Sequence, residues 1–417
     1  MQAIGLRDTQ AGRKRIEHQV PFCDVANTSG RRYRLTGILH AAAARVRYVS
    51  AQVDTVLDEN VHKADAADRR GWRSSAVVCT LVALGSCLLA VAVLVPTYGA
   101  ARLKVIPLDV QSATVSVAED AAVLKATSVA MKGPLKTDRG VPLRIQVYVT
   151  TENPVSADST TLQAAQKTVR TDWGDGLGLV SAMVDRVTID RRSGMPLAVP
   201  VPTTQAELGK PPTETPREGI QYKFPFDVEK VSYPYYDGTA RETHPIEYVD
   251  DDRVVDGMRL YHFQQTIGPV NLGKSIGSVA TTTLPAEKWG LPGTEPTTMD
   301  LHYSTTRDVW VEPASGAIVA VEEQPRRWLA RFVDDPNAVT TLEAHTHFDD
   351  ETINGLAQQA KDARTAILWG TRYGPALSAL AGIVLVGTAI ILARRWSRMN
   401  PKSFLDGQGL RDTRSSR

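Results

Sequence analysis

Cysteine is scarce in this sequence. Among 417 residues the only cysteines are Cys23, Cys79 and Cys87, and none lies in the long middle section, residues 97–375. That section is therefore expected to have neither a disulfide nor a cysteine-rich metal site. With about 280 residues, it is large enough to bury a core without such cross-links.

Sequence motifs of catalysis are also lacking. The chain has no nucleophile elbow of the form GxSxG, no Ser/Lys set of the penicillin-binding kind and no HExxH pair. The sequence therefore predicts no catalytic residue, no cofactor and no enzymatic activity. Because catalytic carboxylates can meet in space without being close in sequence, a periplasmic hydrolase stays open as an alternative.

Clustered positive charge is missing between the two ends of the chain. Residues 76–393 have a net charge of −8. Nucleic-acid binding needs a clustered basic face, so no nucleic acid is expected as a partner.

Two motifs that could hold a ligand lack the context they need. Residues 268–275 fit the pattern GxxxxGK[ST], but Gly277, a β-branched run and Pro285 follow, so no helix is expected to start there and nucleotide binding is not predicted. His345 and His347 precede three acidic residues without further ligands at zinc-like spacing. We interpret them as a polar strand end before a helix and predict no metal site.

Two runs without charge bracket the middle section, at residues 76–95 and 376–393. A helix of roughly 20 apolar residues crosses the hydrocarbon core of a bilayer. The second run is shorter, but Trp369 and Tyr373 precede it at the level where aromatic belts lie. Each run is therefore predicted to be a transmembrane helix.

Arginines lie at the outer ends of both runs, namely Arg69, Arg70 and Arg73 before the first and Arg394, Arg395 and Arg398 after the second. Positive residues near the ends of spans stay cytoplasmic. Both termini are therefore expected in the cytoplasm, with residues 97–350 on the periplasmic side of the plasma (inner) membrane and residues 394–417 as a basic cytoplasmic tail. The first run is too long and begins too late for a cleaved signal peptide.

Residues 1–70 are polar, rich in Arg and Ala, and have only scattered apolar residues. They are predicted to be a disordered cytoplasmic extension. A translation start placed too far upstream is the alternative.

Alternating apolar residues give the middle section a strand pattern. Strands are expected at residues 143–150, 258–267 and 308–312. Residues 187–199 and 309–321 each have Ser-Gly between two apolar runs, which predicts hairpins with Gly194 and Gly316 at positive φ. Their similarity reflects either an old duplication or two ordinary hairpins.

Helical patterns are few in the middle section. Residues 162–171 are predicted to form a short helix. Residues 351–375 have apolar positions at helical spacing after Asp350, a candidate cap, so they are expected to form an amphipathic helix that runs into the second span. The predicted fold class is α+β, a strand-dominated extracytoplasmic domain anchored by two transmembrane helices.

Aromatic residues are concentrated in one part of the sequence. The group consists of Phe224, Phe226, Tyr233, Tyr235, Tyr236, Tyr248, Tyr261 and Phe263. Aromatic side chains most often pack in cores. The alternative is the apolar lining of a ligand groove, and these eight residues are the candidates for it.

Residues 224–264 contain FPF, YPYYD, P-x-E-Y-V and VDGxxxYxF in that order. They resemble an actinobacterial membrane-protein family known as porin PorA, or as a domain of unknown function, that includes LmcA-type lipoglycan-control proteins. The resemblance covers about residues 70–395. It implies a role in a mycolate-type cell envelope.

A pore barrel needs many lipid-facing strands, whereas two helices are expected to anchor this chain. We therefore interpret the resemblance as a lipid or lipoglycan-precursor binding protein that supports envelope assembly, with membrane lipids or lipoglycan intermediates as partners. The alternative is a structural partner or scaffold for membrane glycosyltransferases. Ser378 and Gly382 would then allow close approach of a helix, either the protein's own first span or a partner's.

Overall fold

The computed structural model describes residues 75–174, 178–207 and 209–399. By their internal contacts, residues 1–76 and 77–417 are separate units. The extension predicted over residues 1–70 and most of the tail predicted over residues 394–417 lie outside the described residues, so both stay predictions.

The described part of the chain is dominated by strands. They are β1 (Gln111–Leu124), β2 (Thr137–Glu152), β3 (Ser159–Arg170), β4 (Leu179–Asp190), β5 (Thr203–Gln205), β6 (Thr213–Glu214), β7 (Tyr233–Asp237), β8 (Glu242–Asp250), β9 (Val254–Val255), β10 (Met258–Arg259), β11 (Tyr261–Asn271), β12 (Thr281–Pro285), β13 (Pro296–Val311), β14 (Ile318–Glu323), β15 (Arg326–Ala330), β16 (Val339–Glu343) and β17 (Thr346–Phe348). The strand-dominated character and the three predicted strands are confirmed, although the strand expected at residues 258–267 breaks at Leu260.

Two apolar helices and several short turns complete the described elements. The first apolar helix is Ser75–Gly99, whose last turn is the π-helical η1 (Val95–Gly99). The others are α2 (Ala100–Leu103), η2 (Ala126–Val129), α3 (Leu272–Ser275), η3 (Gly277–Ala280), η4 (Ala286–Trp289), α4 (Asp350–Leu368), η5 (Trp369–Tyr373) and α5 (Gly374–Met399). Residues 272–275, the last four of the GxxxxGK[ST] pattern, form a single helical turn after β11, and a 3-10 turn and β12 follow it in place of the helix that a phosphate-binding loop needs.

One antiparallel sheet holds 15 of the strands. Its order is β6-β5-β4-β3-β2-β1-β16-β15-β13-β11-β8-β7, and β12, β14 and β17 pair beside β13 and β1. Two strand pairs connect β1 to β13. In one of them β16 pairs with β1 and β15 pairs with β13, and in the other β17 pairs with β1 and β14 pairs with β13.

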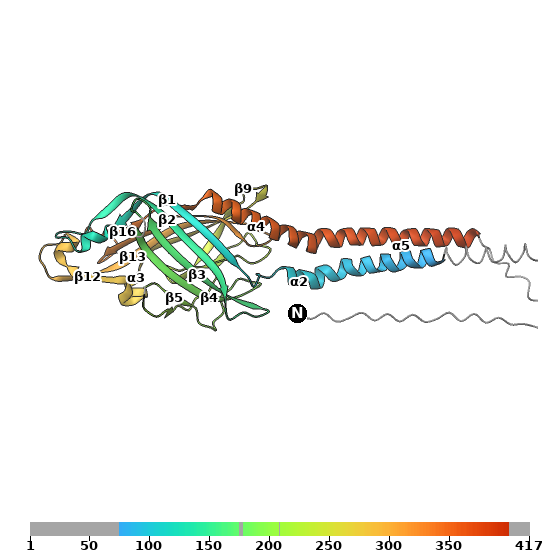
Figure 1. Cartoon of the computed structure of the whole chain (residues 1–417), viewed down its shortest axis with the longest axis horizontal. Coiled ribbons are helices and arrows are strands. Elements are labelled where there is room, and N and C mark those ends of the chain that lie inside the picture. The colour runs from blue at the N-terminus through green and yellow to red at the C-terminus, as the bar shows by residue number, and fades with distance from the viewer. Residues whose placement is uncertain (1–74, 175–177, 208, 400–417) are drawn as a thin grey trace, which may run out of the picture. The chain divides into compact units, whose positions relative to one another are not determined.

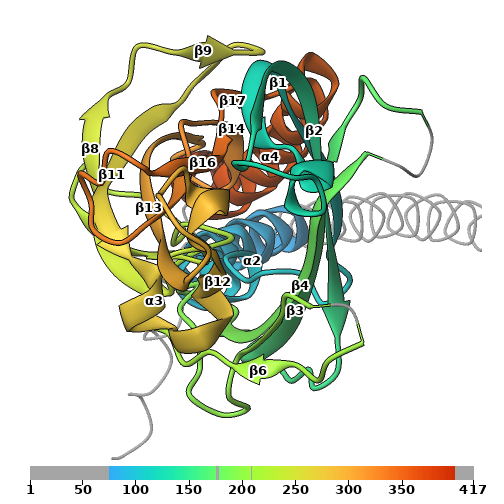
Figure 2. The same cartoon turned by 90° about the vertical axis from the view of Figure 1, so that its left-hand side faces the viewer.

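The sheet curves so that its ends approach each other. Seen end-on, β8 and β4 lie on opposite sides with β1 between them (Figure 2). Ile220, which follows the edge strand β6, forms a parallel bridge with Tyr235 of the other edge strand, β7, and its N–H donates to the carbonyl of Pro234 at 2.9 Å. The chain that leaves one edge of the sheet therefore joins the other edge.

The helix predicted at residues 162–171 is wrong, because these residues form most of β3. Leu162, Ala164 and Thr168 are buried at alternate positions, the period of a strand with one buried face. β3 pairs with β2 on one side and β4 on the other. Pairing on both edges outweighs the local helix preference of Leu, Ala and Gln.

Both predicted hairpin turns are confirmed. Gly194 has φ +74° and Gly316 has φ +70°. In each turn a carboxylate three residues before a serine accepts from that serine's N–H and hydroxyl: Asp190 at 2.7 and 2.8 Å, and Glu312 at 2.7 Å for both. This shared geometry fits a duplication and two ordinary hairpins equally well.

Replacing Gly316 with alanine is expected to lower the free energy of unfolding by about 3 kcal/mol, because positive φ and a steric overlap act together. A Cβ at this position would overlap the carbonyl oxygens of Phe224 and Pro225. Gly133 also has positive φ, +85°, but its Cβ would meet nothing within 4 Å. Gly133→Ala is therefore the control, with an expected cost of about 1 kcal/mol. Urea unfolding followed by tryptophan fluorescence measures both, and equal losses would contradict the role of the overlap.

The second apolar helix, Asp350–Arg398, is continuous through α4, η5 and α5. This confirms the expectation that the amphipathic helix runs into the second apolar run. Its cap is Asp349, not Asp350, since the Asp349 carboxylate accepts from the N–H of Thr352 at 2.9 Å. Ala357 and Ala360 of α4 pack against the sheet. Both apolar helices are long and apolar enough to cross a membrane (Figure 1).

Candidate functional site

Gly85 and Gly382 bring the first apolar helix and α5 into backbone contact; we call these two helices the helix pair. A Cβ on Gly382 would lie 2.9 Å from the carbonyl oxygen of Gly85, and a Cβ on Gly85 would lie 3.0 Å from that of Gly382. Small residues allow such approach. Of the two partners left open for Gly382, the structure therefore shows the protein's own first helix. Gly85 was missed, although it interrupts the first apolar run.

A π-helical turn interrupts each helix at the same level, since η1 contacts η5. Thr97 donates to the carbonyl of Val93 at 2.8 Å, and Thr371 donates to that of Ile367 at 2.7 Å. Tyr98, Trp369 and Tyr373 are 73%, 55% and 53% exposed. π-Helical turns are frequent at functional sites, so this level of the helix pair is a candidate.

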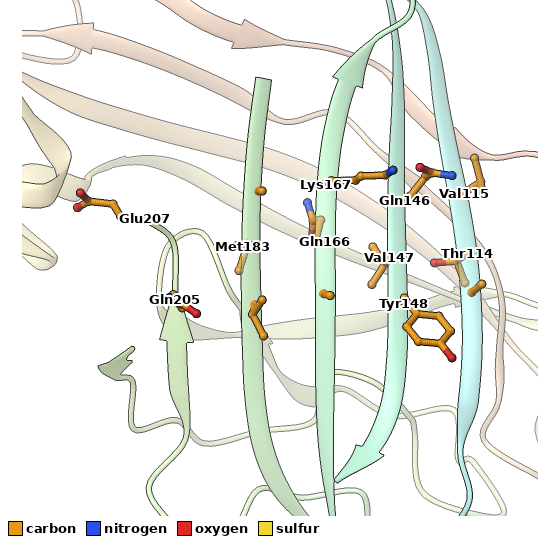
Figure 3. Close-up of a pocket in the computed structure, with 14 residues that line it drawn as sticks. Thr114, Val115, Gln146, Val147, Tyr148, Gln166, Lys167, Met183, Gln205 and Glu207 are labelled. Atoms are coloured by element: carbon orange, nitrogen blue, oxygen red, sulfur yellow. The ribbon is translucent and has the colours of Figure 1, made fainter. Parts of the chain in front are cut away.

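A hollow of about 520 Å³ crosses strands β1 to β5 (Figure 3). Along each strand the side chains alternate in direction: Thr114, Val147, Gln166 and Met183 point to one side and Val115, Gln146, Tyr148 and Lys167 to the other (Figure 3). Lys167 and Glu207 are its charged lining residues. The hollow thus offers mostly apolar surface.

A second hollow, of about 630 Å³, lies where the sheet opens between β1 and β13. The connections from β14 to β15 and from β16 to β17 border it. Its charged and titratable lining residues are Asp120, Arg139, Arg326, Glu343 and His345, and all five are exposed. Both signs of charge face solvent here, so the hollow has no selective charge.

A network of ion pairs and hydrogen bonds around Arg307 connects several strands of the sheet. Arg307 on β13 donates to Asp237 at 2.7 Å, to Glu323 at 2.8 Å and to Gln265 at 2.8 Å. Burial alone would raise the pKa of Asp237, but the Arg307 charge and the Ala240 N–H hold it below its usual value. The network ties together the strands β7, β11, β13 and β14.

A second buried ion pair ties β4 to the segment that connects the edge strands β6 and β7. Arg217 lies between β6 and β7, and its guanidinium donates to both carboxylate oxygens of Asp185 on β4, each at 2.7 Å. The same guanidinium lies 4.5 Å over the ring of Tyr236 on β7. Neither ion pair could be predicted from the sequence, because the partners are far apart along the chain.

The eight aromatic residues proposed as a groove lining mostly lie close together. Phe224 and Phe263 are fully buried, with ring centroids 4.8 Å apart. Tyr233, Tyr235 and Tyr248 pack against these rings, with centroids 5.4–6.2 Å apart.

The remaining three lie around this packed group, and Tyr236 is buried beneath Arg217. Tyr261 packs on Tyr248, and Phe226 lies under the Lys223 ammonium. None of the eight lines either hollow described above.

The His and acidic residues considered for a metal are separated in the structure. His345 borders the second hollow, His347 pairs in β17, and Asp349 caps α4. Across residues 75–174, 178–207 and 209–399, no group of three or more His, Cys, Asp or Glu could hold a metal ion.

These features define a strand-dominated membrane protein in which the strands of one large sheet lie, along the sequence, between two apolar helices that pack side by side. The chain belongs to the porin PorA family, whose family model, described as "Porin PorA", matches residues 77–391. A relative named Porin PorA from Corynebacterium amycolatum is 30% identical over 369 residues, covering 73% of this chain and 95% of the relative. Another of that name, from Corynebacterium resistens, is 27% identical over 397 residues, covering 76% and 96%. The resemblance found in the sequence is confirmed.

These comparisons overturn the functional prediction. The family and both relatives carry the name porin, so a lipid or lipoglycan-precursor binding protein is a wrong prediction. The scaffold and hydrolase alternatives gain no support either. The error came from setting the name aside because the strands do not suit a lipid-facing barrel.

Proposed function

We propose that this chain is a non-enzymatic, pore-forming protein of a cell-envelope membrane, in which copies associate through their helix pairs and let small solutes pass. The single observation that supports this proposal is the surface of the helix pair. Leu84, Val93, Leu380 and Ile383 are between 52% and 63% exposed on it. Such side chains need lipid or other helices around them.

The helix pair, not the sheet, is the part that would contact lipid. Arg144 on β2 and Gln264 on β11 are exposed and Asp308 on β13 is half-buried, and such polar and charged side chains are costly on a lipid-facing strand. Arginines at 394–398 bias that end of α5 toward the cytoplasm, which would place the sheet on the opposite side of the membrane.

One helix pair does not enclose a pore, because Gly85 and Gly382 leave no space between its two helices. Several copies around a common axis are therefore required. Association of copies would use the faces of the helices that are exposed in a single chain.

The test is the conductance of planar bilayers that contain the purified full chain. Gly382→Ala places a Cβ against the backbone of Gly85 and is expected to lower conductance roughly tenfold, because the helices must separate. Gly387→Ala is the matched control on the same helix, since its Cβ would meet nothing within 4 Å, and it is expected to conduct normally.

Two outcomes would contradict the proposal. One is that bilayers with the full chain conduct no better than empty bilayers, and the other is that Gly382→Ala conducts as well as Gly387→Ala. Intact near-ultraviolet circular dichroism of the variants shows that the sheet is unchanged.

A further inference from the structure

The hollow of about 520 Å³ that crosses β1 to β5, which we call the first hollow, has a floor of small side chains. The strand register places Tyr148 between Ala113 and Ala165, and Lys167 beside Ala182. All five residues are exposed, and Tyr148 and Lys167 point to the same side of the sheet (Figure 3). An exposed apolar concavity of this kind is a surface on which another molecule packs.

A hairpin with exposed apolar side chains lies on the other side of the molecule. It consists of residues 249–259, which include β9 and β10, and we call it the β9–β10 hairpin. Its Val249 and Val254 are 48% and 57% exposed. Figure 2 shows β8 and β9 on one side and β3 and β4 on the other. A projecting hairpin on one side and a hollow on the other are the two unlike surfaces that a head-to-tail contact between copies requires.

The β9–β10 hairpin and the first hollow lie at nearly the same level along α4. At the hollow, the N–H of Val115 donates to the hydroxyl of Thr352 at 3.0 Å. At the hairpin, Val255 packs against the buried cluster that contains Ala357. Thr352 and Ala357 are five residues apart, which is a rise of about 7.5 Å along a helix. Because α4 continues into α5, rotation about an axis along the helix pair brings the hairpin of one copy to the hollow of the next.

The charges of the two surfaces are complementary. Residues 247–256 contain five acidic residues and one arginine. Lys167 and Glu207 line the first hollow. Arg144 and Arg186 follow at the next positions of the same face on β2 and β4, and both are exposed. An acidic hairpin and a mainly basic hollow attract each other, whereas two hairpins or two hollows repel.

Each surface also has a charge without a partner in its own copy. Asp251 of the hairpin pairs with Lys230 at 3.0 Å, but the neighbouring Asp252 takes part in no ion pair among residues 75–174, 178–207 and 209–399. Lys167 has none in the same part of the chain. Both side chains belong to exposed residues, so they are available to a neighbouring copy.

We propose that neighbouring copies of this chain also associate through their sheets, with the β9–β10 hairpin of one copy packed into the first hollow of the next. This inference rests on the proposed function, in which several copies surround a common axis. A contact between two unlike surfaces repeats from copy to copy and closes into a ring. Each copy then has one filled hollow and one seated hairpin, which covers the exposed valines and alanines of both surfaces.

The experiment uses cysteine cross-linking of the full chain in liposomes, in a background in which Cys23, Cys79 and Cys87 are replaced by serine. Ala165→Cys and Val254→Cys are made as two separate variants and are co-expressed. The mixture is expected to form roughly tenfold more disulfide-linked dimer than either variant alone, because a disulfide needs two Cα atoms within about 7 Å. Conductance of the same preparations is measured in planar bilayers.

Reversal of charge tests the ion pair between copies. Lys167→Glu and Asp252→Lys, each made in both cysteine variants, are expected to lower dimer formation roughly tenfold, since like charges then face each other. The combination Lys167→Glu/Asp252→Lys is expected to restore it, which a merely structural change would not do. Lys132→Glu is the matched control, because Lys132 is exposed on the loop before β2, away from both surfaces.

Three results would overturn the inference. Dimer could be absent from the mixture although the wild type conducts, it could form equally in each variant alone, or it could stay reduced in the double charge reversal. All three leave the proposed function intact. Absence of any wild-type conductance would contradict the proposed function itself, and this inference with it.

Discussion

Replacing Asp237 with asparagine is expected to lower the free energy of unfolding by about 3 kcal/mol, because Arg307 then keeps a buried charge with one carboxylate instead of two. The Asp237 side chain is fully buried and the Arg307 side chain is 13% exposed. Glu323 remains in contact with Arg307, which limits the loss. The asparagine preserves the shape of the side chain, so the change tests the charge.

The measurement is urea unfolding at pH 7 in detergent, where Asp237 is ionised because its pKa lies below its usual value. Lys361→Gln is the matched control, since Lys361 and Asp256 form an exposed pair at 2.7 Å. An exposed pair contributes less than about 1 kcal/mol.

A double variant, Asp237→Asn/Arg307→Met, distinguishes the ion pair from two independent effects. If Asp237 and Arg307 belong to one network, the double variant is expected to lose about 2 kcal/mol less free energy of unfolding than the two single variants lose in sum. Additive losses would show that the two side chains do not depend on each other, and would contradict the network as described.

Local signals explain what the sequence predicted correctly. The apolar runs, the Ser-Gly turns and the amphipathic helix all depend on neighbouring residues, so their patterns are visible in the sequence. Gly194 and Gly316 are the clearest cases, because the turn requires a positive φ that glycine adopts freely.

Long-range contacts explain what the sequence did not predict. Asp185 meets Arg217, and Asp237 meets Arg307, only after the sheet has curved and its edges have joined. β3 was misread for a similar reason, since its strand form depends on β2 and β4 on either side. Gly382 was identified, but its partner Gly85 required the packing of two distant helices.

The functional prediction failed at a different step. It took a pore to mean a barrel of lipid-facing strands, whereas the strands here carry exposed polar residues such as Arg144 and Gln264. The apolar surface that a membrane requires lies on the helices. The site that follows from this view is the level of η1 and η5.

Stability that rises with pH between about 7 and 10 is the second large effect we expect, and Lys223 is its source. The Lys223 ammonium donates to the carbonyls of Phe224 at 2.9 Å and Ser315 at 2.6 Å, and lies 3.6 Å over the ring of Phe226. Burial lowers the pKa of Lys223 to about 7, while the Glu312 carboxylate opposes this shift. Arg364 lies 3.5 Å from the same carboxylate and weakens that opposition.

The sign follows from proton binding. In the unfolded chain Lys223 keeps its ordinary pKa of 10.5, so between pH 7 and 10.5 the unfolded state binds a proton that the folded state does not. Stability then rises with pH by up to about 1.4 kcal/mol per unit. Below pH 7 both states are protonated and this contribution no longer changes.

Lys223→Met removes the titrating group, so its free energy of unfolding should be nearly independent of pH between 7.5 and 9.5, unlike that of the original chain. Lys230→Met is the control. Side-chain hydrogen bonds to Tyr248 and Asp251 raise the pKa of Lys230, so this lysine stays protonated in the folded and unfolded states between pH 7.5 and 9.5. Urea unfolding at several pH values gives the slopes. The same slope in Lys223→Met as in Lys230→Met would show that Lys223 is protonated in the folded state throughout this range, because its two carbonyl bonds and the Phe226 ring then outweigh the cost of burial.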